Sequence, residues 1–322
     1  MTKVGALLPA WYHRALLDIL ASPREHPSSN CLSHLLASAR PPSTVSRLHN
    51  RVELANTNTI SKTLAATIAA VKKVAREEVM PRYLKVAHER KTDGSLFTQA
   101  DIAAQNALRE ELTAIRNCPL LGEEMKDAEH LSLWDGGNDG IWCVDPIDGT
   151  SNFVNGIPYF AVSVALLQNH WPVLGVVYDP VAEEAFYAER GGGAFLNGVE
   201  LPIHERALTM REAIAEVDFK RLPGPLRAAL ADKPPFSSQR NFGAATLEWC
   251  YVAAGRFNLY LHGGQKLWDY AAGSLILSEA GGQMATFDQD DFWSGNVWKR
   301  SVIASLQPSL FAEWKAWVRE RL

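Results

Sequence analysis

Apolar residues recur every three to four positions in two early segments of the chain, a spacing that predicts two helices. The first is expected over residues 59–80, before Pro81, because proline cannot continue a helix. The second is expected to start at Thr98 and to stop before Pro119. The predicted apolar faces contain Leu64, Ile68, Val71 and Val74 in the first helix, and Ile102, Leu108, Leu112 and Ile115 in the second.

In the middle of the chain the helical spacing of apolar residues ends, and turn residues separate five short apolar runs. These runs predict strands over residues 141–144, 161–167, 173–178, 185–188 and 194–196. Towards the end, the expected elements are a helix over 244–254, a strand over 257–261, a helix over 269–280 and a helix after Pro308. Helices, then a strand-rich region, then mixed elements predict an α+β protein built in layers.

The first fifty-odd residues depart from this pattern. Asp18 and Glu25 are the only acids among residues 1–50, which are rich in Arg, Ser, His and Pro. We predict that residues 1–55 form a partly disordered N-terminal extension outside the folded core. Three interpretations stay open for it: an organellar transit segment, a short helical appendage, or an upstream start that is not used.

Composition narrows the class of protein. The 322 residues include 32 Lys and Arg against 36 Asp and Glu, a formal net charge of −4, which gives no electrostatic case for binding nucleic acid or membranes. No run approaches the roughly 18 apolar residues of a membrane span. The four cysteines are scattered without a C-x-x-C pair, as in a reducing compartment. A cytoplasmic enzyme fits these features.

Residues 145–151 read DPIDGTS and carry the most specific chemistry in the chain. Asp145 and Asp148 lie three residues apart where an apolar strand breaks into a turn, and their oxygens suit a hard cation such as Mg²⁺. Gly149 frees the backbone, and Thr150 can open a helix whose first amides would attract phosphate. Taken alone, the same residues also fit an ordinary capped turn.

Three other acidic sites accompany this motif. Glu123 follows a short apolar run and Gly122, so its side chain can point from a strand end into a cleft. Asp269 starts a helix of small residues that can pack closely against its neighbours. Asp101 stands three residues after Thr98, as in a capping box. Each is compatible with a solvated or capping acid when considered by itself.

Together the four segments resemble the inositol monophosphatase family, whose marks are a Gly-Glu-Glu site, a D-P-[IL]-D-G-[ST] motif and a late W-D-x-A-A-G. These motifs occur here at residues 122–124, 145–150 and 268–273, in the family's order. The resemblance implies that residues 56–322 form the catalytic domain. It also implies a layered αβαβα sugar-phosphatase fold, with a larger antiparallel sheet and a second, smaller mixed sheet, and a homodimer.

The resemblance further implies roles for individual residues. Two to three Mg²⁺ ions per site would be held by Glu123, Asp145, the backbone carbonyl of Ile147, Asp148 and Asp269. The catalytic residues would be Asp101, Thr150 and Glu123, with Asp101 acting as a base through the Thr150 hydroxyl. The substrate would be bound by Asp148, Gly149, Thr150, Gly243, Ala244, Ala245, His262 and Asp269.

The expected reaction is Mg²⁺-dependent, lithium-sensitive hydrolysis of a small phosphate monoester by direct attack of a metal-activated water. His262 stands where inositol phosphatases carry an acid, which puts inositol 1-phosphate in doubt as the substrate. The other substrates that the resemblance allows are 3′-phosphoadenosine 5′-phosphate, fructose 1,6-bisphosphate and histidinol phosphate. A non-enzymatic regulatory or RNA-associated role is the alternative from a different class.

Overall fold

The computed structural model describes residues 60–85, 88–90, 96–137, 139–204 and 208–322. All of them belong to a compact unit, Asn56–Leu322. The predicted N-terminal extension over residues 1–55 lies outside the described residues. Among the described helices, none has the length and apolar content that a membrane span requires.

The larger sheet has seven strands in the order β3-β4-β5-β6-β7-β8-β9. The β3–β4 pair is parallel and all later pairs are antiparallel, so this sheet is antiparallel except at one edge. The five predicted strands are confirmed within it. Its strands are β3 (Leu120–Gly122), β4 (Ile141–Asp148), β5 (Ala161–Gln168), β6 (Trp171–Asp179), β7 (Glu184–Glu189), β8 (Ala194–Leu196) and β9 (Val199–Glu200).

The parallel edge positions the site. Gly122 at the end of β3 is the register partner of Val144 in β4. Glu123, which follows β3, and Asp145, which lies within β4, are therefore neighbours at this edge of the sheet. A strand order that depends on a crossover cannot be read from local periodicity, because it is decided by packing of the whole sheet.

The smaller sheet is mixed, as predicted, with the order β11-β10-β12-β14-β13. The predicted strand over 257–261 starts later and extends further, because a bulge between His262 and Gln265 lets the chain continue beside β14. The described strands of this sheet are β10 (Ile214–Asp218), β11 (Ser238–Arg240), β12 (Leu259–Gln265), β13 (Gln283–Ala285) and β14 (Arg300–Ser305); β1 (His88–Arg90) and β2 (Leu96–Thr98) form a separate hairpin.

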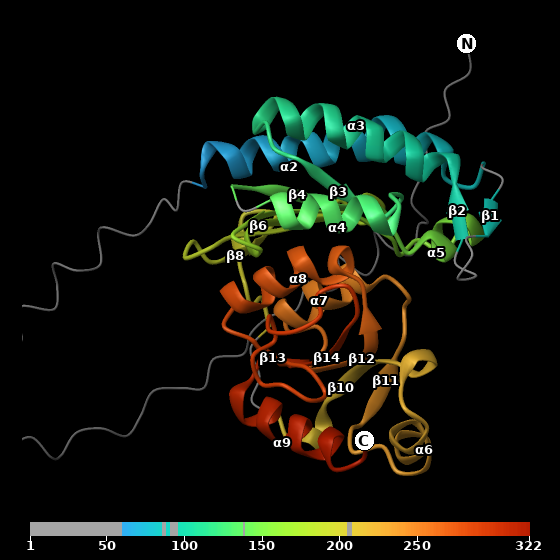
Figure 1. Cartoon of the computed structure of the whole chain (residues 1–322). Helices are drawn as coiled ribbons and strands as arrows, with labels where there is room; N and C mark the ends of the chain where they lie inside the picture. Colours follow the sequence, from blue (N-terminus) through green and yellow to red (C-terminus); the bar gives the residue numbers. More distant parts are fainter. Residues whose placement is uncertain (1–59, 86–87, 91–95, 138, 205–207) are drawn as a thin grey trace, which may run out of the picture. The chain divides into compact units, whose positions relative to one another are not determined.

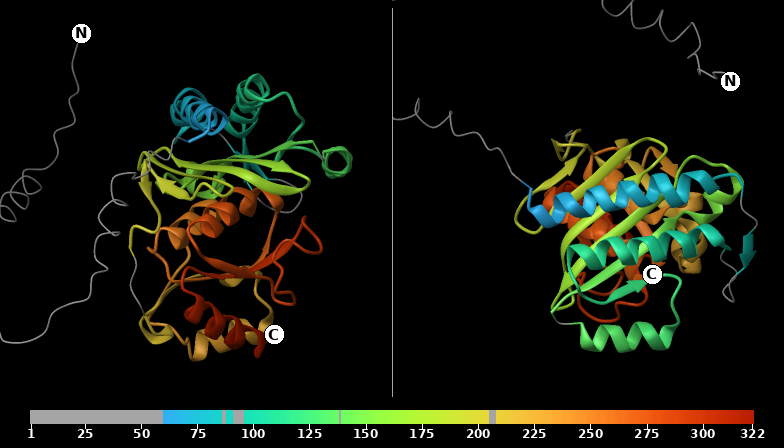
Figure 2. Two further views of the ribbon diagram at one scale, coloured as in Figure 1. Left: turned by 90° about the vertical axis from the view of Figure 1, so that its left-hand side faces the viewer. Right: turned by 90° about the horizontal axis from the view of Figure 1, so that it is seen from above.

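Helices cover both sheets and fill the space between them (Figures 1 and 2). One pair covers the outer face of the large sheet, a second pair lies between the sheets, and a third covers the outer face of the small sheet, which confirms the αβαβα layering. These pairs are α2 (Lys62–Val74) with α3 (Gln99–Ile115), α7 (Ala245–Ala253) with α8 (Leu267–Glu279), and α6 (Gly224–Asp232) with α9 (Pro308–Arg319); α4 (Asp127–Gly136) and α5 (Thr150–Asn155) flank the large sheet.

Local sequence explains how these helices pack. Helix α8 is buried on nearly all sides because it lies between two sheets, and a Cβ on its Gly273 would come within 2.4 Å of the Trp249 side chain. The predicted close packing of this small-residue helix is confirmed. The first predicted helical segment reaches its expected end, but its hydrogen-bond pattern changes: α2 is followed directly by a π-helical turn, Ala75–Val79, and a 3₁₀ turn, Met80–Arg82. Ile102, predicted on the apolar face of α3, is 36% exposed.

Candidate active site

A cavity of about 1290 Å³ gathers acids from three distant parts of the chain. Glu123 reaches it from the end of β3, Asp145 and Asp148 from the end of β4, and Asp269 from the first turn of α8. The structure thus brings together the four carboxylates that the sequence predicted to share one site.

Backbone amides and one hydroxyl hold the aspartates in place. Asp145 is 2% exposed, and its Oδ1 accepts a hydrogen bond from the Ile147 amide at 3.1 Å. Asp148 Oδ2 accepts from the Thr246 amide at 2.6 Å and from the Thr246 hydroxyl at 2.7 Å. Asp269 Oδ2 accepts from the Lys266 amide at 2.8 Å. Each carboxylate is therefore oriented before any ligand binds.

Burial and mutual repulsion raise the pKa of these carboxyls. Desolvation raises the pKa of Asp145 most, followed by the charges of Glu123 and Asp148. Desolvation also raises the pKa of Asp148 to about 6 against the Thr246 hydrogen bonds, and it raises the pKa of Asp269, with Asp148 as the next cause. Several negative charges share a small volume, and a divalent cation would relieve their repulsion.

The donor set fits Mg²⁺, which prefers oxygen ligands and keeps several waters. In the described residues no group of three or more His, Cys, Asp or Glu side chains is already arranged to hold a metal ion. One oxygen each of Asp145 and Asp148 accepts a hydrogen bond from a backbone amide. A Mg²⁺ site commonly has one or two carboxylates, completed by water and substrate phosphate, so an all-protein cage is not required.

The turn after the aspartates adopts the predicted strand-to-helix form. Gly149 has φ +88° and ψ 33° at the N-cap of α5, a conformation that glycine adopts without strain. A Cβ there would also meet the Ala244 methyl and the Tyr159 carbonyl at 3.1 Å. Gly149 and Thr150 both line the cavity, and the Thr150 hydroxyl donates to the Ile147 carbonyl at 3.0 Å.

Asp101 performs the capping role that its spacing with Thr98 predicted. Its Oδ2 accepts from the Thr98 amide at 2.9 Å and from the Thr98 hydroxyl at 2.6 Å. The side chain is fully buried and is not among the described residues that line the cavity, yet its charge adds to the raised pKa of Asp145. Its role as a base through Thr150 stays a prediction.

The predicted substrate residues divide into two groups. Gly243 and Ala245 line the cavity, whereas Ala244 is buried against Gly149. His262 also lines the cavity, but both of its ring nitrogens are engaged.

The His262 ring is held by two partners from different elements. Nε2 lies 3.1 Å from Asp218 Oδ2, and Nδ1 accepts from the Gly264 amide at 3.1 Å. Because Nδ1 accepts from the Gly264 amide, the N–H of the ring is on Nε2 and is donated to Asp218; burial lowers the pKa of His262. It therefore orients Asp218 and Gly264 and has no N–H left for a substrate hydroxyl.

Sequence reasoning missed a buried polar network behind the Gly243 segment. Glu248 accepts from the Gly243 amide at 3.0 Å and from the Tyr260 hydroxyl at 2.9 Å. Glu216 is fully buried nearby, and neither of its carboxyl oxygens has a hydrogen-bond partner among the described residues. Burial and the charge of Glu248 raise the pKa of Glu216 to about 9. The signal was an acid inside the apolar run of residues 213–217.

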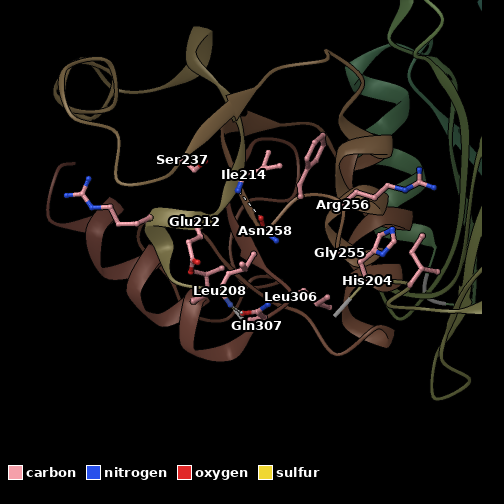
Figure 3. Close-up of a pocket in the computed structure, with 14 residues that line it drawn as sticks. His204, Leu208, Glu212, Ile214, Ser237, Gly255, Arg256, Asn258, Leu306 and Gln307 are labelled. Atoms are coloured by element: carbon pink, nitrogen blue, oxygen red, sulfur yellow. Dashed lines mark hydrogen bonds between the residues drawn. The ribbon is translucent and has the colours of Figure 1, made fainter. Parts of the chain in front are cut away.

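A second cavity of about 740 Å³ lies apart from the carboxylates, beside the start of β10 and the end of α7 (Figure 3). Asn258 at its centre accepts from the Ile214 amide at 2.8 Å, and Arg256 points away from the cavity, where it pairs with Glu184. None of the predicted site residues lines it. The chemistry of the site belongs to the larger cavity.

The profile described as "Inositol monophosphatase family" matches residues 56–319. The chain belongs to the inositol monophosphatase family. The resemblance that the acidic motifs carried is thereby confirmed. Proteins of this family hydrolyse phosphate monoesters, and this member is a phosphoric monoester hydrolase.

Two bacterial relatives show the extent of the similarity. Inositol-1-monophosphatase of Caulobacter vibrioides is 37% identical over 226 residues, which are 68% of this chain and 85% of that protein. The Nus factor SuhB of Haemophilus influenzae is 37% identical over 192 residues, 55% of this chain and 71% of that protein.

Solved structures of the family share the fold. The extragenic suppressor protein suhB of Bartonella henselae superposes with a TM-score of 0.69 at 29% identity, over 81% of this chain and all of that one. An IMPase/NADP phosphatase complexed with Mg²⁺ and phosphate gives 0.65 at 25% identity, over 77% and 89%. A LiCl-soaked inhibitory complex of a staphylococcal inositol monophosphatase-1 gives 0.67 at 25%, over 79% and 92%.

Proposed function

We propose that this phosphatase hydrolyses a small phosphate monoester and requires Mg²⁺ for it. Glu123, Asp145, Asp148, Asp269 and the carbonyl of Ile147 would hold the metal. The observation that carries the proposal is the convergence of the four carboxylates on one cavity beside the Gly149–Thr150 turn. The related IMPase/NADP phosphatase complex with Mg²⁺ and phosphate supports it.

Residues at different positions in the cavity would have different roles in the reaction. When bound, Mg²⁺ supplies positive charge that offsets the charge of the phosphate and acidifies a neighbouring water. The amides of Gly149 and Thr150 would orient the phosphate at the start of α5, and the Thr150 hydroxyl would turn from the Ile147 carbonyl towards the attacking water. Asp101, fixed by Thr98, would act as the base through the Thr150 hydroxyl and accept the proton that this water gives up.

The substrate's organic part would lie against Gly243 and Ala245, which the Glu248 hydrogen bond to the Gly243 amide holds in place. Lithium inhibition is expected, in keeping with the LiCl-soaked complex of the staphylococcal relative. The homodimer and the cytoplasmic location stay predictions from the sequence.

Phosphate release from a panel of monoesters tests the proposal. Inositol monophosphate, fructose 1,6-bisphosphate, 3′-phosphoadenosine 5′-phosphate and histidinol phosphate are incubated with the purified protein in Mg²⁺ and, separately, in EDTA. We expect turnover of at least one substrate in Mg²⁺ and its loss in EDTA. No turnover of any of them, or turnover that survives EDTA, would contradict the proposal and favour the regulatory role that the sequence left open.

A further inference from the structure

Five basic side chains share the active-site cavity with the carboxylates: Lys126, Lys220, Arg221, Lys266 and Lys299. The cavity, at about 1290 Å³, also exceeds the roughly 300–1000 Å³ typical of small-molecule sites. A single sugar or inositol phosphate would leave part of this space unused. The basic residues that line the cavity therefore indicate what else it binds.

The bulge of β12 brings several of these basic residues to one wall. A Cβ on Gly264 would lie 3.2 Å from Cε of Lys299, so the lysine stem crosses this glycine. A Cβ on Gly263 would lie 1.9 Å from the Arg221 carbonyl, so the chain at Arg221 packs directly on the same bulge. Lys266 follows the bulge in sequence, at the start of α8. The two glycines thus let segments from three elements meet.

Charges on this wall do not cancel. Asp218 is already engaged, because its Oδ2 accepts from Arg221 at 2.9 Å and from His262 at 3.1 Å. In the described part of the chain, no ion pair is formed by Lys220, Lys266 or Lys299. Three lysine side chains therefore line the cavity without an ion pair to neutralise them among the described contacts.

We propose that this wall, formed by Lys220, Lys266 and Lys299 around the Gly263–Gly264 bulge, binds a second phosphate group of the substrate. The inference rests on the proposed function and narrows it to bisphosphorylated small molecules: the scissile ester lies at the carboxylate end and the retained phosphate at the lysine wall. Esters with a positively charged organic part, such as histidinol phosphate, are disfavoured because the lysines repel them.

Matched pairs of substrates test the proposal. We compare kcat/KM for adenosine 3′,5′-bisphosphate with that for adenosine 3′-monophosphate, and for fructose 1,6-bisphosphate with that for fructose 1-phosphate, at low salt. The wild type is expected to prefer one bisphosphate at least about tenfold, a preference that falls in high salt. The double variant Lys266→Ala/Lys299→Ala is expected to lose most of this preference, while Lys233→Ala, an exposed lysine outside the cavity, keeps it.

Equal kcat/KM within both pairs, or an unchanged preference in the double variant, would overturn the inference. Calorimetric binding in EDTA separates it from the proposed function. One outcome would support the second phosphate site while contradicting the proposed hydrolysis. In it, no substrate is turned over, but the wild type binds a bisphosphate about tenfold more tightly than the corresponding monophosphate, and the double variant lacks this preference. Equal affinity of the wild type for the bisphosphate and the monophosphate would contradict the second phosphate site.

Discussion

The two ends of the active-site cavity differ in how their charged side chains are held. At the carboxylate end, Asp145 is buried and Asp148 accepts two hydrogen bonds from Thr246, so the geometry exists before ligands bind. At the lysine wall, Lys266 and Lys299 are exposed and form no ion pair among the described contacts. A pre-oriented cluster suits chemistry that needs fixed distances, whereas exposed lysines on long stems suit recognition of charge.

The largest effect is expected at the carboxylate end, from Asp145→Asn. Loss of this carboxylate should lower kcat in Mg²⁺ by about a thousandfold, because phosphoryl transfer depends mainly on positioning and charge neutralisation. Without metal, the variant should unfold at a temperature no lower than the wild type, since one repelling charge is gone. Steady-state kinetics and thermal unfolding in EDTA measure both.

Asp135→Asn, an exposed acid of α4, is the matched control for this variant and should change neither quantity. If Asp145→Asn keeps the wild-type kcat at saturating Mg²⁺, Asp145 does not take part in catalysis.

Thr246→Val should lower kcat by about tenfold, through the orientation of Asp148. The substitution removes the 2.7 Å hydrogen bond from the hydroxyl but keeps the one from the amide, so the carboxylate is held by a single donor. Thr246→Ser retains the hydroxyl and is expected to behave like the wild type. Equal rates for the Val and Ser variants would show that the hydroxyl does not matter.

Gly263→Ala should distort the lysine wall and leave the carboxylate end in place. The added methyl would lie 1.9 Å from the Arg221 carbonyl, so the backbone must move, at a cost of about 1–3 kcal/mol. We expect a lower unfolding temperature and a severalfold higher KM, with a smaller change in kcat. Gly136→Ala, where a Cβ meets nothing within 4 Å, serves as the control. A kcat loss as large as that of Thr246→Val would mean that the two ends are not separable.

Glu216→Gln should alter the pH dependence of stability with little effect on turnover. The folded protein keeps the Glu216 proton up to about pH 9, whereas the unfolded chain releases it near 4.5, so ionisation destabilises the fold as pH rises between these values. Glutamine cannot ionise. At pH 9 it should raise the free energy of unfolding by about 1–2 kcal/mol and the unfolding temperature by several degrees, with little change at pH 5. Glu313→Gln on the exposed face of α9 should shift neither. Parallel pH curves for Glu216→Gln and wild type would refute the raised pKa.

The local pattern of apolar and capping residues was sufficient to predict the elements that are stabilised by their own residues. The Thr98 cap of α3 and the five antiparallel strands were predicted because capping geometry and alternation act over a few residues. The strands β10, β11 and β14 were not, since their pairing joins segments far apart in the chain. For the same reason Thr246 was missed: it contacts Asp148, 98 residues away.

By itself, the sequence determined the family, the layered α+β fold and the identity of the four acids, because those motifs are short and specific in spacing. The tertiary structure alone decided which side chains face one another. It brought Glu123 beside Asp145 through the parallel β3–β4 pair, engaged His262 with Asp218, and gathered lysines at the β12 bulge. These contacts arise from packing of distant segments, and no local propensity encodes them.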